Sequence, residues 1–376
     1  MIPFVKASIV GRELEYIADV LKSSKFSGDG KYTKKCHKVF EDRYGFNKVL
    51  LTTSCTDALE MAAILCNIQS GDEIIIPSYT FVSTANAFVL RGAKIVFADS
   101  RIDTPHLDEN SLEGLISDKT KVIVPVHYAG SACEMDKIKE ISEKYNLFVI
   151  EDAAQAIDSY FKEKPLGSLG TFGTFSFHDT KNITCGEGGL LCINDSQFSQ
   201  RAEIIREKGT NRSAFIRGEA EKYGWVDLGS SFLPADILSA FLYGQLERID
   251  AIQNHRRELW NRYHKHLFDL EKGEKIIRQK IPKHSTNNAH MYYVLCNSIK
   301  DRTFVIEYLK KKNIISSFHY LPLHKSKFFE SKHDGRELPN CDRFADTLLR
   351  LPLFNDLKVE EVDMICNELY EAFSLL

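Results

Sequence analysis

The chain has 376 residues, 49 of them Lys or Arg and 52 Asp or Glu, and a formal net charge of −3. This length predicts two domains rather than one small core, and the balanced charge excludes an electrostatic reason to bind nucleic acid or a membrane surface. The longest apolar runs are strand-sized, which excludes a spanning helix. Met1–Lys6 lacks the pattern of a secretory signal. Nine scattered cysteines without CxxC pairs indicate reduced thiols and no metal site. We expect a cytoplasmic enzyme.

Between residues 48 and 193, short apolar runs alternate with helical stretches such as Thr56–Asn67 and Met135–Tyr145. Each run has the length of a strand, and several are apolar on both faces, as expected where helices cover both sides of a sheet. The pattern predicts an α/β large domain with a mostly parallel, seven-stranded sheet. The expected strands are Val49–Leu51, Ile74–Ile76, Ile95–Phe97, Val122–Val126, Leu147–Ile150, Thr174–Phe177 and Leu190–Ile193.

After residue 198 the pattern changes to longer helices with a few short apolar runs. These segments are sufficient for a small α+β domain. We place the boundary inside the long helix near residues 245–255, which predicts domains of 1–250 and 251–376. The expected segments are helices at 198–208 and 234–272, the run Met291–Leu295, a helix near Arg302–Lys312, the run Ile314–Phe318 and a helix at Val359–Phe373.

Two of the predicted strands lead into residues of opposite charge. Leu147–Ile150 is followed by Asp152, and Thr174–Phe177 by Lys181, which precedes the glycine-rich turn Cys185–Gly189. A structural salt bridge would also satisfy a buried Asp152. An ordinary surface lysine is a poor explanation for Lys181, because it follows an apolar strand and precedes a glycine-rich turn. Ligands gather at the carboxyl ends of strands in open α/β sheets. Pyridoxal phosphate needs a carboxylate at its ring nitrogen and a lysine at its aldehyde, so this pair predicts that cofactor.

Other strand ends carry residues that suit the same cofactor. The helix opening at Ser54–Thr56 offers backbone N–H groups and hydroxyls for a phosphate, although alone it is explained by an ordinary N-cap. Phe81 could stack on a flat ring or belong to the core, and His127 could contact a ligand or only a loop. Ser176 adds a further hydroxyl. Their joint occurrence and order favour a fold-type I pyridoxal phosphate enzyme.

Several motifs resemble those of the DegT-type nucleotide-sugar aminotransferases, over a span from about Pro3 to past Pro352. The resemblance implies an aspartate aminotransferase-like large domain, pyridoxal 5′-phosphate with pyridoxamine phosphate as the intermediate, and a homodimer with the active site at the subunit interface. The motifs are Pro77–Thr84, Val126–Gly130, Glu151–Gln155, Phe175–Asn182 and Gly186–Gly189.

A closer resemblance is to the dTDP-4-amino-4,6-dideoxyhexose transaminases. It implies amination of dTDP-4-keto-6-deoxy-D-glucose at C4 by L-glutamate, giving 2-oxoglutarate and a galacto or gluco amino sugar for O-antigen or other surface polysaccharide. The segments that carry it are Arg206–Arg212, Asp227–Ser231, Phe318–His324 and Leu351–Phe354.

The resemblance also implies roles for individual residues. Lys181 is expected to form the Schiff base and to shuttle protons, and Asp152 to pair with the ring nitrogen. Many relatives have an asparagine for the partner's phosphate where this chain has Leu233, so Ser230 or Ser231 is expected to replace it. The other expected residues are Ser54, Cys55, Thr56 and Ser176 at the phosphate, Phe81 stacked on the ring, Gln155 near its 3′ oxygen, and His127, Tyr128, Arg212, His319, Tyr320 and His324 at the substrate, Arg212 from the neighbouring subunit.

Other functions fit the residues of the chain less well, and some details of the reaction stay open. A sugar dehydratase of the same family carries histidine in place of Lys181, and a nucleotide-sugar oxidoreductase or epimerase would need a GxGxxG turn, which is absent. A non-enzymatic pyridoxal-binding regulator would bring a DNA-binding module and a basic face, and neither is visible in the sequence. An aminotransferase acting at C3 of an isomeric sugar stays open. So does the axial or equatorial configuration at C4, and the choice of dTDP over UDP rests on the resemblance alone.

Overall fold

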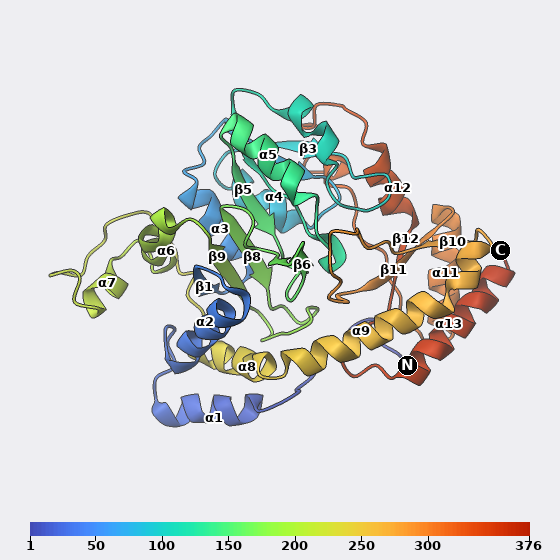
Figure 1. Ribbon diagram of the computed structural model, residues 1–376, viewed down its shortest axis with the longest axis horizontal. Coiled ribbons are helices and arrows are strands. Elements are labelled where there is room, and N and C mark those ends of the chain that lie inside the picture. The colour runs from blue at the N-terminus through green and yellow to red at the C-terminus, as the bar shows by residue number, and fades with distance from the viewer.

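The computed structural model describes residues 1–376, and its largest element is a seven-stranded sheet with the order β1-β9-β8-β5-β4-β2-β3 (Figure 1). β9 runs antiparallel to β8 and β1, whereas the other neighbouring strands are parallel. The predicted α/β class and the seven mostly parallel strands are confirmed. The strands are β1 (Lys48–Thr52), β2 (Glu73–Pro77), β3 (Lys94–Ala98), β4 (Thr120–Ile123), β5 (Phe148–Asp152), β8 (Phe172–Ser176) and β9 (Gly189–Ile193).

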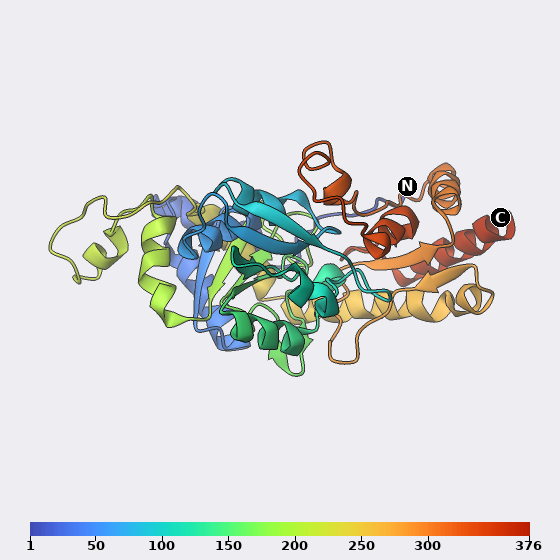
Figure 2. The same ribbon diagram turned by 90° about the horizontal axis from the view of Figure 1, so that it is seen from above.

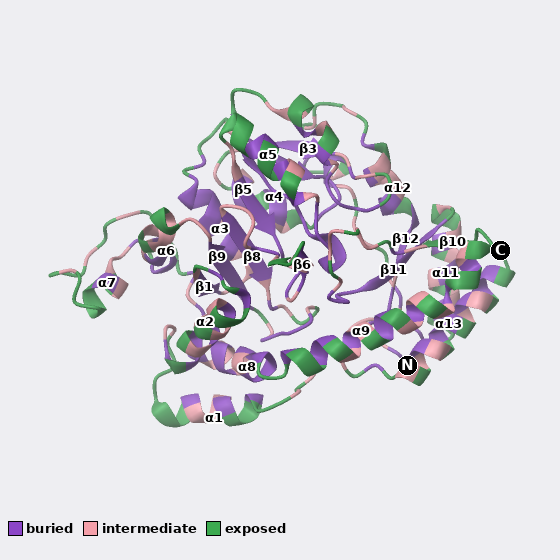
Figure 3. Ribbon diagram, viewed as in Figure 1, coloured by how far each residue is buried: buried purple, intermediate pink, exposed green.

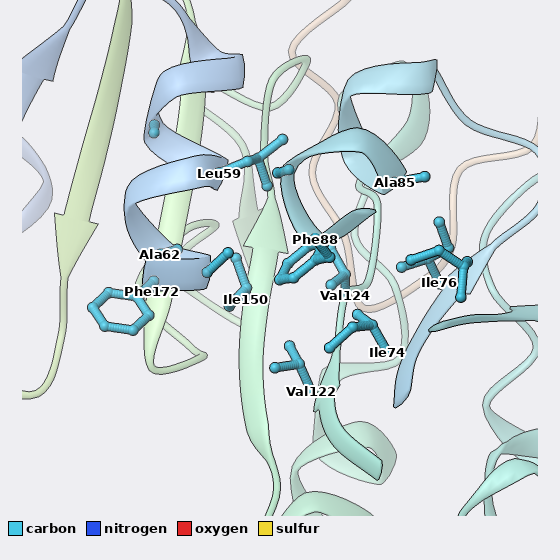
Figure 4. Packing of buried hydrophobic residues seen from close by; sticks show 14 of the residues in the cluster. Leu59, Ala62, Ile74, Ile76, Ala85, Phe88, Val122, Val124, Ile150 and Phe172 are labelled. Atoms are coloured by element: carbon cyan, nitrogen blue, oxygen red, sulfur yellow. The ribbon is translucent and has the colours of Figure 1, made fainter. Parts of the chain in front are cut away.

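Helices cover both faces of this sheet. Consecutive side chains of a strand point to opposite faces, and in β2 Ile74 and Ile76 belong to one buried cluster while Ile75 belongs to another. Figure 4 shows the first cluster, where Leu59 and Phe88 from two helices pack over the strands. This explains why the strands are apolar on both sides. The helices before residue 250 are α1 (Glu13–Ser23), α2 (Lys31–Tyr44), α3 (Cys55–Leu65), α4 (Val82–Val89), α5 (Met135–Tyr145), α6 (Ser199–Arg206), α7 (Arg212–Ile216) and α8 (Asp236–Leu246).

A second, three-stranded antiparallel sheet of order β10-β11-β12 lies beyond the long helix α9 (Figures 1 and 2). It has its own buried cluster, which joins the strands to α9 and α13 through residues such as Tyr263, Tyr292 and Leu369. A short antiparallel hairpin, β6 (Tyr160–Phe161) and β7 (Lys164–Pro165), lies between β5 and β8 in the chain. The remaining elements are α9 (Ile249–His266), α10 (Phe268–Lys272), β10 (Ile276–Arg278), β11 (Tyr292–Cys296), α11 (Ile299–Lys311), α12 (Pro339–Thr347), β12 (Leu348–Leu351) and α13 (Val359–Ser374).

The N-terminal segment links the two sheets. Ile2 is buried in the cluster of the three-stranded sheet, and its backbone bonds to Asn313 at 2.8 Å and to Ile315 at 3.0 Å. The chain then returns to α1, which packs against α8 on the other side of the molecule (Figure 1). Residues 3–10 therefore cross from one part of the fold to the other.

Residues 208–231, which include α7, form an arm that extends from the body (Figure 1). Much of it is exposed (Figure 3), and the exposed side chains include large apolar ones: Trp225 is 84% exposed and Ile216 64%. Such a cluster of exposed apolar residues is typical of a protein–protein contact.

Two of the expected elements differ in the structure. The single helix expected at 234–272 is three helices, because Arg248 adopts φ −109° and ψ 7° and the chain breaks again at Leu267. Neither glycine nor proline stands at Arg248 or Leu267, so the sequence does not mark these breaks. The run Ile314–Phe318 makes only isolated bridges, to Ile2 and Arg350. No helix of the chain combines the length and apolarity needed to cross a bilayer.

Candidate active site

A cavity of about 620 Å³ lies at the carboxyl ends of β1, β5 and β8 and is closed on the other side by residues near the three-stranded sheet. The parallel direction of these strands brings residues from distant parts of the sequence to one edge. Ten of the residues predicted for the site line this cavity: Ser54, Cys55, Thr56, Phe81, Asp152, Gln155, Ser176, Lys181, His319 and Tyr320.

Asp152 is the last residue of β5, and its carboxylate is buried. One oxygen accepts a hydrogen bond from the Thr84 hydroxyl at 2.7 Å, and the other accepts one from the backbone of Ala154 at 3.2 Å. Neither partner carries a charge. A buried carboxylate held only by neutral donors favours a cationic partner, and the protonated ring nitrogen of pyridoxal phosphate is such a group.

Lys181 follows β8 in a loop that folds back on the end of that strand. Thr184 bonds to the carbonyl of Phe177 at 2.9 Å through its hydroxyl, and Cys185 bonds to the same carbonyl at 3.0 Å through its backbone. These bonds fix the loop, and the lysine lines the cavity. Burial lowers the pKa of the Lys181 amine; Asp152 opposes this shift, and Arg350 adds to it. A lowered pKa raises the neutral fraction of the amine, the form that acts as nucleophile or base.

The helix opening after β1 gives the cavity an anion-binding end. Ser54 caps α3 by accepting the backbone N–H of Asp57 at 3.0 Å, so the ordinary capping role is present. The backbone N–H groups of the first residues, Cys55 and Thr56, have no partner within the helix and lie at its positive end. Gly189 allows this turn to approach β9, because a Cβ there would overlap the Ser54 backbone. The turn, with Ser176 beside it on the cavity wall, suits a phosphate.

The remaining wall combines an aromatic ring with polar groups. Phe81 is 56% exposed, and the centre of its ring lies 6.2 Å from that of Tyr320. Gln155 donates to the Tyr320 hydroxyl at 3.1 Å. The Tyr128 hydroxyl lies 3.1 Å from Nδ1 of His319. Burial lowers the pKa of His319, which keeps its imidazole neutral.

Five predicted residues lie outside the cavity. His127 is fully buried, where its Nε2 lies 2.9 Å from the Glu151 carboxylate, and Nδ1 of His324 lies 2.8 Å from the Ser78 hydroxyl. Tyr128 is buried behind the cavity wall, where its hydroxyl lies 3.1 Å from Nδ1 of His319 and its ring packs against that of Tyr320. The other two are on the arm: Arg212 bonds to Glu207 at 3.0 Å, and Ser230 is exposed.

Four further residues line the cavity and were not predicted from the sequence. Thr84 bonds to Asp152. His290 lines the cavity and is held through Nδ1 by Asn182 at 2.9 Å, directly after the lysine. Phe4 and Arg350 line the cavity from the N-terminal segment and β12. Only Thr84 lay in a quoted motif; no periodicity or spacing singles out the others.

The donor set of this cavity fits pyridoxal phosphate: a lysine of lowered pKa, a buried carboxylate without a charged partner, and a helix N-terminus. On this fold these groups define the class of fold-type I pyridoxal phosphate enzymes.

Comparison with known proteins gives the family. Residues 7–370 match the model of the DegT/DnrJ/EryC1/StrS aminotransferase family, and the chain belongs to that family. The predicted membership of the DegT-type aminotransferase family is therefore confirmed.

Individual relatives cover almost the whole chain. An uncharacterized protein of Methanocaldococcus jannaschii, MJ1066, is 32% identical over 381 residues, which cover 99% of this chain and 98% of the relative. The structure of Spr1654 from Streptococcus pneumoniae, named as a sugar aminotransferase, has a TM-score of 0.90 and 26% identity, and covers 99% of this chain and 98% of its own. The aminotransferase TlmJ from Streptoalloteichus hindustanus has a TM-score of 0.91 and 26% identity, with 100% and 99% covered. Spr1654 is described in PLP and PMP forms, which supports the predicted cofactor and its aminated intermediate.

Proposed function

We propose that the protein is a nucleotide-sugar aminotransferase that transfers the amino group of L-glutamate to C4 of dTDP-4-keto-6-deoxy-D-glucose. The products are 2-oxoglutarate and a dTDP-4-amino-4,6-dideoxyhexose, which serves surface polysaccharide such as O-antigen. The observation that carries the proposal is that Lys181 and Asp152 line one cavity at the ends of two neighbouring parallel strands. The family membership supports the transamination, and the C-terminal motifs support the sugar.

Lys181 is proposed to carry out the proton transfers. When bound, pyridoxal phosphate supplies an aldehyde for amines and a ring that accepts electrons from the reacting carbon. The Lys181 amine removes the proton from the α-carbon of the donor and later delivers a proton to C4 of the sugar. Its lowered pKa favours the neutral amine that the first step requires. Asp152 would hold the ring nitrogen of the cofactor and keep it protonated.

The proposed sugar contacts come from His319 and Tyr320, which give the cavity a neutral imidazole and a phenol, whereas Gln155 is proposed to lie near the 3′ oxygen of the cofactor. Neutral donors and acceptors of this kind suit sugar hydroxyls and a keto oxygen, because they hydrogen-bond without requiring a charged partner. The face of C4 that Lys181 protonates then determines whether the product has the galacto or the gluco configuration.

The proposed assembly is a homodimer in which the arm at 208–231 contacts the partner. The exposed apolar residues of the arm, including Trp225 and Ile216, support such a contact. In this arrangement Arg212 and Ser230, which do not line the cavity of their own chain, reach the cavity of the partner. The proposed location is the cytoplasm, where the activated sugar is made.

The test begins with the absorbance of the purified protein. A band in the near-violet that is lost on addition of L-glutamate indicates pyridoxal phosphate and donor use. The treated protein is then mixed with dTDP-4-keto-6-deoxy-D-glucose, and proton NMR of the product reads the couplings at H4. An amine at C4 supports the proposal and gives its configuration. An amine at C3 of an isomeric substrate, or a band without turnover of any keto-sugar, would overturn it.

A further inference from the structure

Arg350 is an arginine on the cavity wall that has no carboxylate partner. It lies on β12 and lines the same cavity as Lys181. Its Nη2 donates to the carbonyl of Phe318 at 3.2 Å, and its buried Nε has no hydrogen-bond partner. Leaving a buried charged donor unpaired is costly. The guanidinium group therefore lines an open cavity without an acidic partner in the chain, which favours an anionic ligand at this position.

The guanidinium group of Arg350 is held in place on one face. Its Cζ lies 4.5 Å from the centre of the Phe4 ring, which is a cation–π contact. Phe4 is in turn fixed because Ile2, two residues earlier, is buried and bonded to the 313–315 segment. A guanidinium group that is already oriented loses little conformational entropy when it binds a ligand, which favours affinity.

The charges of the cavity favour an anion at Arg350. Two carboxylates line the cavity: Asp152, which is bound by Thr84, and Glu187, whose side chain is 66% exposed and lies 3.7 Å from His178. Neither forms an ion pair with Arg350. The planar guanidinium matches a carboxylate through two parallel hydrogen bonds.

We propose that Arg350 binds a carboxylate of the amino donor. This inference rests on the proposed use of glutamate. Arg350 and Lys181 line the same cavity of about 620 Å³, and the reacting carbon of the donor must lie at the Lys181 amine. A small dicarboxylic amino acid can therefore reach both groups at once. The alternative anion is the diphosphate of the sugar nucleotide, and the experiment separates the two.

The experiment is isothermal titration calorimetry on the purified holoenzyme. The probes are glutarate, which has the two carboxylates of glutamate and no amine, and dTDP, which has the nucleotide and diphosphate and no sugar. The variants are Arg350→Gln, which removes the charge, and Arg350→Lys, which keeps the charge but lacks the planar guanidinium group that can form two parallel hydrogen bonds. Arg12→Gln is the matched control, because Arg12 is exposed and pairs with Glu15 outside the cavity. A thermal melt of each variant checks that the fold is retained.

We expect Arg350→Gln to raise the Kd for glutarate on the order of 100-fold, as for loss of a charged two-bond contact. Arg350→Lys should raise it less, and Arg12→Gln should leave it unchanged. The Kd for dTDP should be the same in all four proteins. An unchanged glutarate Kd would overturn the inference, and so would weaker binding of dTDP, alone or together with glutarate. Because glutarate binding needs no sugar, failure of the proposed sugar reaction leaves this result readable by itself.

As a second readout, L-alanine and 4-aminobutyrate each keep one carboxylate of glutamate. If Arg350 binds the carboxylate next to the amine, the Arg350→Gln change slows loss of the near-violet band with alanine. If it binds the distal carboxylate, the change slows the loss with 4-aminobutyrate. A variant that reacts with both as fast as the unchanged protein would overturn the inference.

Discussion

The two walls of the cavity are built in different ways. The wall formed by the seven-stranded sheet carries its functional groups directly at strand ends, as with Asp152 at the end of β5 and Lys181 in the loop after β8. The opposite wall takes His319 from a loop, His290 from the residues before β11 and Arg350 from within β12. The N-terminal segment adds Phe4.

The difference suggests separate roles, with proton transfer on the wall formed by the seven-stranded sheet and substrate recognition on the opposite wall. A parallel sheet covered on both faces is rigid, and its strand ends hold the proton-transferring groups at fixed positions. The loops of the opposite wall supply groups that contact substrate, and they can vary without disturbing the sheet. We therefore expect substitutions on the sheet wall to affect both half-reactions, and substitutions on the opposite wall to affect one of them.

The largest effect is expected for Lys181→Ala. Removal of the amine eliminates the base for both half-reactions, and general acid–base groups contribute about 10²–10⁴-fold, so turnover should fall below detection. The measurement is product formation, together with the absorbance of the bound cofactor. Lys164→Ala is the control, because Lys164 is an exposed lysine in strand β7 of the β6–β7 hairpin. Retained turnover in Lys181→Ala would contradict the assignment of this lysine.

A smaller loss is expected for Asp152→Asn. Asparagine keeps an oxygen for Thr84 but loses the negative charge that holds a proton on the ring nitrogen. Removing one such electrostatic contact typically costs about 10²–10³-fold in rate. Stopped-flow spectra of the glutamate half-reaction and of the keto-sugar half-reaction should both be slower. If only one of them changed, Asp152 would belong with the recognition residues instead.

The pH dependence of the glutamate half-reaction tests the state of Lys181. Burial lowers the pKa of this amine below its usual value, so the neutral base is present at lower pH than for an exposed lysine. The rate constant should rise with pH through this lowered pKa and level off above it. Single-turnover rates measured from neutral to alkaline pH give the position of the rise. A rise at the usual pKa of an exposed lysine would mean that burial does not act on the amine.

The sequence predicted the sheet wall better than the opposite wall, for a physical reason. Short apolar strands mark their own ends, so Asp152 and Lys181 could be assigned to one site before the structure was known. Arg350 lies in a strand that was not predicted, and its position beside Phe4 depends on packing between chain ends more than 340 residues apart. His127 shows the converse limit. It follows β4, yet pairing with Glu151 turns it into the interior.

His319→Asn tests the opposite wall. The imidazole of His319 lines the cavity and is kept neutral by burial, so it is placed to hydrogen-bond the sugar. Loss of a neutral hydrogen bond in a closed site costs about 1–3 kcal/mol, which corresponds to roughly 5–150-fold. We expect this loss in the keto-sugar half-reaction and a change of less than about 3-fold in the glutamate half-reaction. Equal losses in both would remove the distinction between the walls.

The smallest effect is expected for Tyr128→Phe, which acts through His319. The Tyr128 hydroxyl lies 3.1 Å from Nδ1 of His319, and burial raises the pKa of this tyrosine, so it retains its proton. When that proton is donated to Nδ1, the neutral imidazole carries its own proton on Nε2. Without the hydroxyl both tautomers become available, and a hydrogen bond of this kind contributes about 0.5–1.5 kcal/mol.

The keto-sugar half-reaction of Tyr128→Phe should therefore be about 2–10-fold slower, and the double variant with His319→Asn should be no slower than His319→Asn alone. Tyr293→Phe is the matched control, because its ring centre lies 6.0 Å from that of Tyr128 in the same aromatic cluster. An additive effect in the double variant would mean that Tyr128 acts independently of His319. Non-additivity would instead show that a buried tyrosine behind the cavity sets the proton position of a residue that contacts the substrate.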